Sequence, residues 1–377
     1  MKTPLSYIEI SRENLLHNFE LFRKLLPSHI KVACVVKANA YGHGISEVVN
    51  LLKKTTDYFQ VDDAEEFLEV YKITSKPILI LGYVQQNDLA LIIERGAEFV
   101  VYDLERLPQI ELMAKRLKTF ANVHIKIDAF LGRQGLLVNQ LALFLVELKK
   151  CKHINVLGVY AHFANIEDTT SFAHAQKQIN EFKKAKVILK THGFSKINTH
   201  ISSTSGVLAY EQKAQENSLV RLGLGLYGLW PSSPLKKVYL APKVDLKPVL
   251  RWLTKIAQVK LLPKNHPVGY GLTYTTTKNT KIAIIPQGYS DGYDRGFSNN
   301  GFVLIHGKRC KVIGRISMNM FAVNVSHLID VKPEEEVVLI GNQGKECILA
   351  EELGEQIKTI NYEITARLSP KIPRIVV

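Results

Sequence analysis

The feature that most constrains the fold is a regular alternation of apolar, β-branched runs with amphipathic helical stretches between residues 31 and 227. The runs predict eight strands, at 31–37, 58–62, 77–82, 98–102, 123–128, 154–162, 197–203 and 219–227. Helical patterns follow at 45–54, 63–72, 86–95, 104–118, 138–150, 170–192 and 205–213. This alternation predicts a parallel (β/α)8 barrel of the TIM type. The competing interpretation, an open doubly wound sheet, is disfavoured because no G-x-G-x-x-G motif follows the first strand.

The composition changes after the barrel region. Four prolines lie between residues 229 and 248, which indicates a domain boundary. Short β-rich runs separated by Gly, Pro, Asn and Asp turns then predict a smaller, mainly β domain, with strands at 249–262, 281–286, 302–306, 309–316, 320–325 and 335–341. Two late helices are expected at 349–356 and 360–368. We therefore expect a barrel over residues 1–235 and a β domain over 236–377. The first strand, at 6–10, is counted with the barrel or alternatively with the second domain, and a helix follows it at 12–26.

Length and composition narrow the class of protein. A chain of 377 residues with 46% hydrophobic and 22% charged residues is expected to form a soluble protein of two domains. No apolar run reaches the roughly 20 residues that a membrane-spanning helix needs, and residues 1–20 are too polar for a signal peptide. The cysteines are scattered without a C-x-x-C pair, so we expect free thiols in a cytoplasmic protein and no metal site: Cys34, Cys151, Cys310 and Cys347.

The net charge of +14 raises the hypothesis of nucleic-acid binding. The lysines form dispersed pairs, such as 53–54, 149–150, 183–184 and 236–237, without interleaved aromatic residues. A solvated basic surface is therefore the favoured interpretation, with neither nucleic acid nor membrane as a partner.

Lys37 ends the first apolar run and is the strongest single candidate for chemistry. An ammonium group at the end of a buried strand loses hydration, which favours the neutral, nucleophilic amine. Such a lysine can form a Schiff base with a carbonyl cofactor. The alternative is a lysine whose side chain extends from the strand end into water.

Other ionisable and small polar residues end the later strands of the predicted barrel. Lys126 and Asp128 end the fifth strand, His162 the sixth, and residues 202–205 the seventh, while Arg221 lies on the eighth. Barrel enzymes carry their chemistry at the carboxyl ends of the strands. The sequence therefore predicts an active site at this rim.

The segment 35–44, Val-Val-Lys-Ala-Asn-Ala-Tyr-Gly-His-Gly, resembles the lysine signature of the alanine racemase family. Further motifs of that family match in the same order, at 126–135, 158–164, 220–228, 268–274, 288–293 and 314–319. The resemblance covers nearly the whole chain. It implies a pyridoxal 5'-phosphate (PLP) enzyme that interconverts L-alanine and D-alanine and supplies D-alanine for peptidoglycan.

The resemblance also implies a role for individual residues around the cofactor. Lys37 corresponds to the lysine that holds PLP, and Arg221 to the arginine that faces the pyridine nitrogen. Arginine donates a hydrogen bond there without giving up its proton, so the ring remains a weaker electron sink. His162 corresponds to the histidine that links this arginine to the catalytic tyrosine. The other cofactor contacts implied, mostly to the phosphate, are Tyr41, Ser203, Thr204, Gly223, Leu224 and Tyr362.

For the substrate side, the resemblance implies two bases on opposite faces of the α-carbon, Lys37 and Tyr270. In this family the tyrosine comes from the partner subunit, which implies a homodimer with shared active sites. Arg133 and Met318 would contact the substrate, and Lys126 corresponds to a lysine that is carbamylated in many members. The residues implied at the substrate entrance are Tyr289, Glu167, Arg295 and Arg315.

Three departures from the family pattern stand close to these residues. Residues 129–131 are Ala-Phe-Leu where the family usually has Thr-Gly-Met, Leu222 replaces a proline, and Asn319 replaces an aspartate beside Met318. Three other functions stay open from the sequence. These are a racemase acting on another amino acid such as serine, a non-catalytic PLP-homeostasis barrel protein, and a basic scaffold for nucleic acid. The β domain with Tyr270 argues against the second, since a carrier needs no second base.

Overall fold

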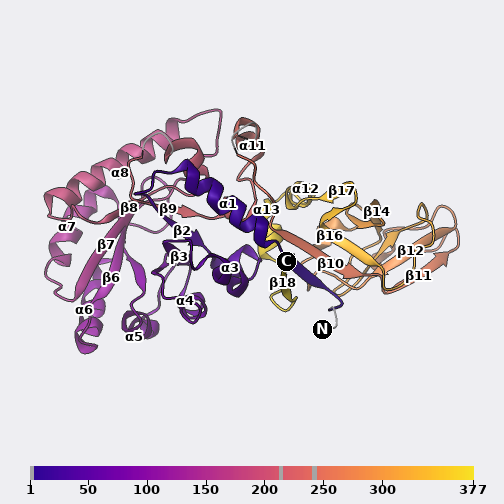
Figure 1. The fold of residues 1–377 in the computed structure, drawn as a ribbon, viewed down its shortest axis with the longest axis horizontal. Helices are drawn as coiled ribbons and strands as arrows, with labels where there is room; N and C mark the ends of the chain where they lie inside the picture. The colour runs from indigo at the N-terminus through magenta and orange to yellow at the C-terminus, as the bar shows by residue number, and fades with distance from the viewer. Residues whose placement is uncertain (1–3, 212–214, 240–243) are drawn as a thin grey trace.

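The computed structural model describes residues 4–211, 215–239 and 244–377, which form two lobes along one long axis (Figure 1). The predicted helix at 205–213 therefore extends by two residues outside the described part of the chain. The barrel forms one lobe and the β domain the other, and the C-terminus lies near the junction between them (Figure 1). None of the helices in the described ranges is long and apolar enough to cross a membrane.

Eight parallel strands form the first sheet, which confirms the prediction of a (β/α)8 barrel. Their order is β8-β7-β6-β5-β4-β3-β2-β9. The two end strands approach each other, because the Ser218 amide donates to the Thr199 carbonyl (3.0 Å) and the Arg221 amide to the Ser202 carbonyl (3.0 Å). The barrel is thus nearly closed, with strands β2 (Lys31–Val35), β3 (Tyr58–Val61), β4 (Ile78–Ile80), β5 (Glu98–Val101), β6 (Ala121–Lys126), β7 (Ile154–Tyr160), β8 (Asn198–His200) and β9 (Leu219–Leu222).

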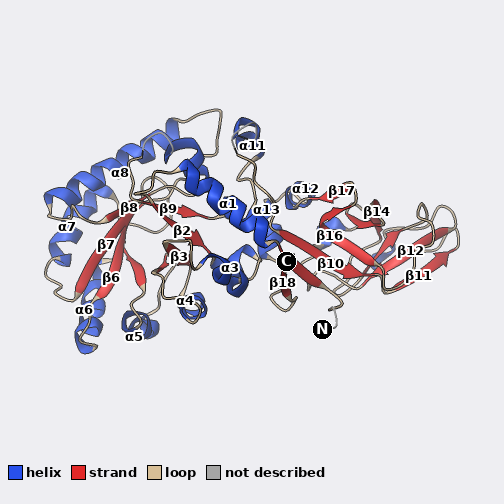
Figure 2. Cartoon of the chain, viewed as in Figure 1, coloured by secondary structure: helices blue, strands red, loops and turns tan. Residues whose placement is uncertain are grey.

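Helices surround this sheet on its outer face, as Figure 2 shows. Each packs an apolar stripe against the strands, as expected for amphipathic helices that cover a parallel sheet. They are α1 (Arg12–Leu25), α3 (Ile45–Leu52), α4 (Ala64–Tyr71), α5 (Leu89–Glu94), α6 (Leu107–Arg116), α7 (Val138–Leu148) and α8 (Ala173–Thr191). After β8, the short helix α9 (Thr204–Gly206) continues into a π-helical turn over Val207–Glu211.

The second lobe is built on a ten-stranded sheet in the order β11-β12-β15-β14-β13-β16-β10-β1-β18, with β17 paired to β16. Strand β1 (Tyr7–Ile10) lies between β10 and β18, so the start of the chain belongs to the sheet of this lobe. The other strands are β10 (Leu250–Lys255), β11 (Gln258–Leu262), β12 (Thr280–Ile285), β13 (Phe302–Ile305), β14 (Lys308–Ile313), β15 (Phe321–Asn324), β16 (Glu336–Gln343), β17 (Glu346–Ile348) and β18 (Arg374–Val376).

Three helices accompany the second sheet: α11 (Ser233–Tyr239), α12 (Ala350–Gln356) and α13 (Asn361–Ala366). Helix α11 lies inside the proline-rich segment where the sequence predicts a linker. The division of the chain near residue 235 stays a prediction.

The chain directly after Lys37 forms a left-handed turn. Residues 38–41 have φ between 51° and 54°, although none of them is glycine. This conformation costs roughly 1–2 kcal/mol per residue, because Cβ approaches the following carbonyl oxygen. The sequence predicts only a turn of small residues here.

Two kinds of contact hold this turn. The side chain of Asn39 accepts a hydrogen bond from the Ile45 amide (2.9 Å). Gly42 lies so close to helix α13 that a Cβ atom would stand 1.8 Å from the Thr365 carbonyl oxygen. Arg374 of β18 donates to the Gly42 carbonyl (2.9 Å). The second lobe therefore supports the turn that follows Lys37.

Candidate active site

Lys37 lies at the mouth of the barrel, directly after β2. Its Nζ forms an ion pair with Asp62 Oδ1 at 3.0 Å, and 40% of its side chain is exposed. The expectation of an ammonium without hydration is wrong for this structure, because the mouth is open and a carboxylate stands beside the lysine. Asp62 was not recognised from the sequence, although it follows β3 as Lys37 follows β2.

Glu66 of helix α4 fixes the positions of both groups. Its carboxylate accepts hydrogen bonds from the Ala38 amide (2.6 Å) and the Asp62 amide (2.8 Å). Burial raises the pKa of this carboxyl group above its ordinary value. Asp63 caps the same helix by accepting from the Glu66 amide (2.9 Å). One side chain thus joins the ends of two neighbouring strands at the rim.

The residues predicted to contact phosphate gather on one side of the mouth. A Cβ atom on Gly223 would lie 3.1 Å from the Tyr41 hydroxyl oxygen, so the main chain at Gly223 and this hydroxyl approach closely. The rings of Tyr41 and Tyr362 meet edge to face with centroids 6.4 Å apart. Thr204 Oγ1 accepts from the Gly225 amide (3.1 Å), which joins the segment after β8 to the segment after β9. Ser203 and Leu224 flank these two segments.

Arg221 is buried and connects two histidines. Its Nη2 donates to His162 Nδ1 (3.0 Å) and its Nη1 to His200 Nδ1 (2.6 Å). Burial lowers the pKa of Arg221 to about 10, at which the guanidinium remains charged at neutral pH. Burial, and then the charge of Arg221, lower the pKa of His162 well below its ordinary value. Because arginine can only donate, His162 is a neutral imidazole with its proton on Nε2.

Lys126 ends β6 inside the barrel, with Nζ 4.2 Å from the centroid of the Tyr160 ring. Burial lowers the pKa of Lys126 to about 6, and the charges of Arg221 and Arg133 contribute in the same direction. The amine is therefore largely neutral above about pH 7. Tyr160, which the sequence analysis missed, also lies against Arg221, whose guanidinium carbon is 5.3 Å from the ring centroid.

A second group of predicted residues lies on loops of the β domain. A Cβ atom on Gly271 would meet Arg315 Nη1 at 2.8 Å, so the loop of Tyr270 packs on Arg315. The Tyr289 amide donates to the Ser317 carbonyl (3.2 Å), which joins the loop after β12 to the loop of Met318. Arg295 begins a short 3-10 turn at 295–297, after the same loop of Tyr289. Four predicted residues thus gather on adjoining loops, Tyr270, Tyr289, Arg315 and Met318.

Asn319 completes a hydrogen-bonded chain between these loops. Its amide nitrogen donates to Ser290 Oγ (2.8 Å), and this hydroxyl donates to the Met318 carbonyl (2.9 Å). An aspartate would compete for the single hydroxyl proton of Ser290. The departure at residue 319 therefore suits the local hydrogen bonding.

The structure does not bring Tyr270 to the barrel mouth of its own chain. Its side chain is 73% exposed, and among the described residues no hydrogen bond joins it to Lys37, His162 or Arg221. Glu167, in the loop after β7, does approach the mouth: together with burial, its charge raises the pKa of Tyr362.

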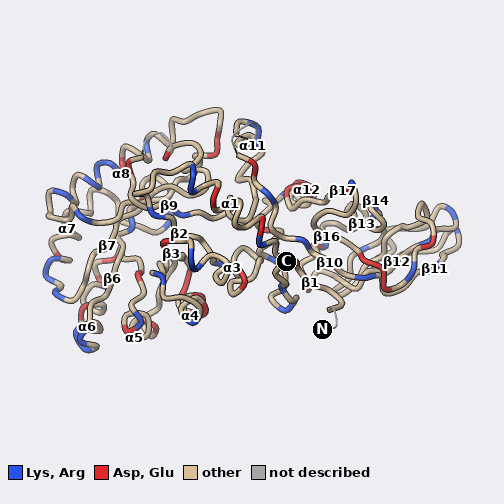
Figure 3. The backbone as a smooth tube through the Cα atoms, viewed as in Figure 1, with Lys and Arg blue, Asp and Glu red and all other residues tan. Residues whose placement is uncertain are grey.

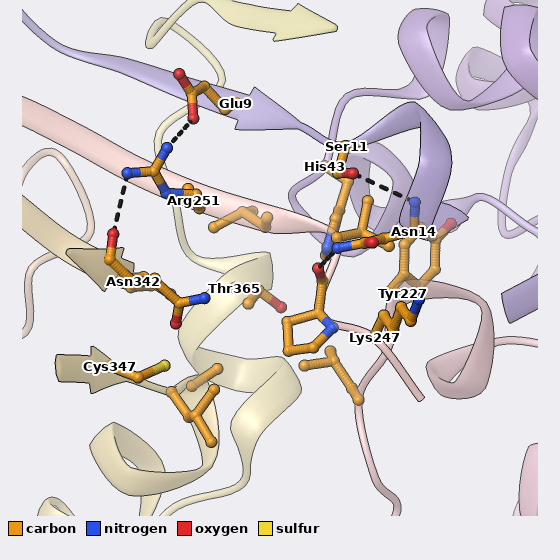
Figure 4. Close-up of a pocket in the computed structure, with 18 of the residues that line it drawn as sticks. Glu9, Ser11, Asn14, His43, Tyr227, Lys247, Arg251, Asn342, Cys347 and Thr365 are labelled. Carbon is orange, nitrogen blue, oxygen red and sulfur yellow. Dashed lines mark hydrogen bonds and ion pairs between the residues drawn. The ribbon is translucent and has the colours of Figure 1, made fainter. Parts of the chain in front are cut away.

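A cavity of about 290 Å³ lies elsewhere, where the barrel meets the β domain (Figure 4). The Arg251–Glu9 ion pair stands on one side of it and His43 with Tyr227 on another. None of the predicted site residues lines this cavity. Within residues 4–211, 215–239 and 244–377, no cluster of three or more His, Cys, Asp or Glu side chains is placed to hold a metal.

A lysine and a buried arginine at the mouth of a (β/α)8 barrel, followed by a β domain, define a two-domain barrel enzyme. Two family models match these parts. "Alanine racemase, N-terminal domain" matches residues 10–231, and "Alanine racemase, C-terminal domain" matches residues 249–376. The chain belongs to the alanine racemase family.

Individual relatives agree with this assignment. The alanine racemase of Leptospira interrogans serovar copenhageni is 34% identical over 100% of this chain and 96% of its own length. Alanine racemase 2 of Caldanaerobacter subterraneus subsp. tengcongensis is 33% identical over 98% of this chain and 94% of its own. Among solved structures, the Clostridium difficile alanine racemase superposes with a TM-score of 0.92 at 33% identity, over 100% of this chain and 97% of its own. The Bacillus anthracis alanine racemase with bound L-Ala-P has a TM-score of 0.92 at 29% identity, over 100% and 96%.

Proposed function

We propose that this chain is an alanine racemase that interconverts L-alanine and D-alanine with PLP held by Lys37. The observation that carries the proposal is the common position of Lys37, Tyr41, Gly223 and Arg221 at one barrel mouth, in a chain of this family. The biological role proposed with this activity is the supply of D-alanine for peptidoglycan. The compartment proposed is the cytoplasm, because the four cysteines are free thiols.

The residues at the mouth fit PLP. The half-exposed amine of Lys37 is accessible to a carbonyl carbon. The main chain at Gly223 and the Tyr41 hydroxyl, which lie close together, are proposed to contact the phosphate, with Thr204 and Tyr362 beside them. The remaining contacts proposed for the cofactor come from Ser203, Leu224 and His162, and Arg221 is proposed to donate to the pyridine nitrogen. When bound, PLP supplies an electron sink for the α-carbon of the amino acid.

Racemisation needs one base on each face of the α-carbon, and the chain offers two. Lys37 Nζ is proposed to take or return the α-proton on one face, and Tyr270 Oη on the other. A phenolate oxygen needs a hydrogen-bond donor to be stable near neutral pH. His162 offers this donor at Nε2, with the positive charge of Arg221 directly behind it. Arg133 and the main chain at Met318 are proposed to hold the substrate carboxylate.

We propose a homodimer in which the partner supplies Tyr270. The support is the separation of the two bases within one chain and the exposure of the β-domain loops, including Leu272 and Met320 next to the predicted residues. Exposed apolar side chains in such a group are typical of a protein interface. The proposed dimer would place four residues around the substrate entrance: Tyr289, Glu167, Arg295 and Arg315.

Lys126 is proposed to carry a carbamate. Its neutral amine can attack carbon dioxide, so that a nitrogen–carbon bond forms and the displaced proton leaves to solvent. The resulting negative charge would stand near Arg133 and Arg221, which both act electrostatically on this lysine. The carbamate would thus offset the buried positive charge of Arg221 and the charge of Arg133.

The test is the formation of D-alanine from L-alanine by purified, PLP-loaded protein, with L-serine measured alongside. The expected result is turnover with alanine preferred. Preference for serine would reassign the substrate, and bound PLP without any turnover would favour the homeostasis protein. DNA binding without PLP binding would revive the scaffold hypothesis, although Lys and Arg are interspersed with Asp and Glu over both lobes (Figure 3).

A further inference from the structure

A chain of polar side chains crosses the inside of the barrel beneath the mouth. Glu98 Oε2 lies 2.8 Å from His124 Nε2, and His124 Nδ1 lies 2.9 Å from His200 Nε2. His200 Nδ1 then lies 2.6 Å from Arg221 Nη1. All four side chains are buried, and they come from four different strands, β5, β6, β8 and β9. These hydrogen bonds therefore link Glu98, the first residue of β5, to Arg221, the arginine proposed to face the cofactor.

The direction of every hydrogen bond in this chain is fixed by its arginine end. Arginine only donates, so His200 Nδ1 accepts and the His200 proton stands on Nε2. That proton is donated to His124 Nδ1, which leaves the His124 proton on Nε2. The last proton is donated to the carboxylate of Glu98, which as an anion only accepts.

The same reasoning excludes a charged imidazole in the chain. A protonated His124 would carry hydrogen on Nδ1 as well, and His200 Nε2 would then face it without a lone pair to offer. Burial, followed by the charge of Arg221, also lowers the pKa of His200 well below its ordinary value. The chain thus holds two neutral histidines between one buried cation and one buried anion.

The packing keeps both rings in place. His124 lies opposite Gly158 in the β6–β7 ladder, and a Cβ atom on Gly158 would stand 2.3 Å from His124 Nδ1. The His200 ring stacks on Tyr160, with centroids 4.9 Å apart and planes 6° apart. A buried cation of this kind is strongly destabilising without a compensating charge. Glu98 provides that charge without touching the mouth.

We propose that Glu98 is a positioning residue whose carboxylate, acting through His124 and His200, holds Arg221 charged and oriented toward the cofactor. This inference rests on the proposed function for its catalytic consequence. The hydrogen bonds themselves depend only on residues of this protein. The hydrogen bonding and its catalytic consequence can therefore be tested separately.

The first experiment measures histidine protonation in cofactor-free protein labelled with ¹⁵N-histidine. Nuclear magnetic resonance distinguishes the two neutral forms of the ring from the charged one, and His→Gln substitution of each residue in turn assigns the signals. We expect His124 and His200 to remain neutral with hydrogen on Nε2 between pH 6 and pH 9. A proton on Nδ1 of either ring would overturn the proposal. The experiment needs neither PLP nor alanine, so an inactive wild type would refute the proposed function and leave this result standing.

The second experiment uses Glu98→Gln in the PLP-loaded enzyme. The glutamine amide oxygen can accept the same hydrogen bond, so the substitution removes the charge and keeps the geometry. We expect kcat per bound cofactor to fall about tenfold with KM within about twofold, because the charge acts on a residue that contacts the cofactor. The visible absorbance maximum of bound PLP should also shift in this variant.

Glu111→Gln is the matched control. Glu111 Oε1 pairs with His153 Nδ1 at 2.7 Å in the same barrel, and this pair has no link to Arg221. The control should leave kcat and the absorbance of bound PLP unchanged. If Glu98→Gln lowers the unfolding temperature but keeps full kcat and an unchanged absorbance maximum, Glu98 is merely structural and the proposal fails.

Discussion

The two halves of the candidate site differ in how completely one chain builds them. In the barrel half, Arg221 is 2% exposed, and buried partners hold its guanidinium from several strands. In the β-domain half, Tyr270 is 73% exposed and Met318 is 55% exposed. Buried polar groups need fixed partners, whereas exposed ones can take water as a partner. The comparison indicates that the barrel half is preorganised within one chain, whereas the residues of the β-domain half stand open to solvent, as the proposed homodimer requires.

The strongest test of the barrel half is Lys37→Ala. We expect the activity to fall about 10⁴-fold, because a base and the covalent anchor of the cofactor are lost together. Reduction with borohydride followed by mass spectrometry should find PLP attached to the wild type and none on the variant. Lys53→Ala on the barrel surface serves as control. Covalent PLP in Lys37→Ala would assign the anchor to another lysine.

Tyr270→Phe tests the β-domain half. Turnover should fall about 10²- to 10³-fold in both directions, since one of two bases is removed while the lysine remains. Cofactor content should equal that of the wild type, measured by absorbance. Tyr83→Phe removes a hydroxyl from another exposed tyrosine and should change neither quantity. Normal turnover by Tyr270→Phe would exclude the two-base scheme.

Mixing these two inactive variants tests whether the halves meet across subunits. If each site takes Lys37 from one chain and Tyr270 from the other, a mixed dimer contains one intact site of two. After exchange of equal amounts, roughly a quarter of the wild-type activity should return. An equal mixture of Lys37→Ala with a Lys37→Ala, Tyr270→Phe double variant should recover none. No recovery in the first mixture, with subunit exchange verified, contradicts a shared site.

The smallest expected effect concerns the pH dependence of stability from Lys126. Its pKa is about 6 in the folded chain against an ordinary value of 10.5. Between these values the unfolded chain binds more protons, so the folded state gains stability as pH rises, by at most about 1.4 kcal/mol per pH unit.

Thermal unfolding in buffer free of carbon dioxide measures this effect. From pH 7 to pH 9 the wild type should gain more in unfolding temperature than Lys126→Met, which has no charge to bury. Lys149→Met, at an exposed lysine, should follow the wild type. Parallel curves for wild type and Lys126→Met would show that the amine is not buried as a neutral group.

The elements that the sequence predicted well are those with a strong hydrophobic period. The strand expected at 154–162 is β7 (Ile154–Tyr160), and the helix expected at 138–150 is α7 (Val138–Leu148). Strands β17 and β18, of three residues each, were not predicted from the sequence. The left-handed turn was missed because Ala and Asn favour negative φ in most contexts, and tertiary contacts decide otherwise here.

In the candidate site, too, some residues could be predicted from the sequence and others could not. Lys37, His162 and Arg221 could be placed at one rim because parallel strands all point the same way. Glu98 and His200 could not be joined to Arg221 in advance, since the contact between His124 and His200 links positions 76 residues apart. The sequence did offer one indication of polar side chains inside the barrel: polar residues stand at alternate positions of apolar strands, such as His124 and Lys126 in β6.

The left-handed turn has a consequence for when the segment after Lys37 can fold during synthesis. Its support comes from Thr365 and Arg374, and Arg374 lies 332 residues further along the chain than Gly42, whose carbonyl it binds. Strand β1 also pairs with β18, so the sheet of the second lobe joins segments that are made at different times. A nascent chain can therefore complete its barrel strands well before the segment after Lys37 takes its final shape.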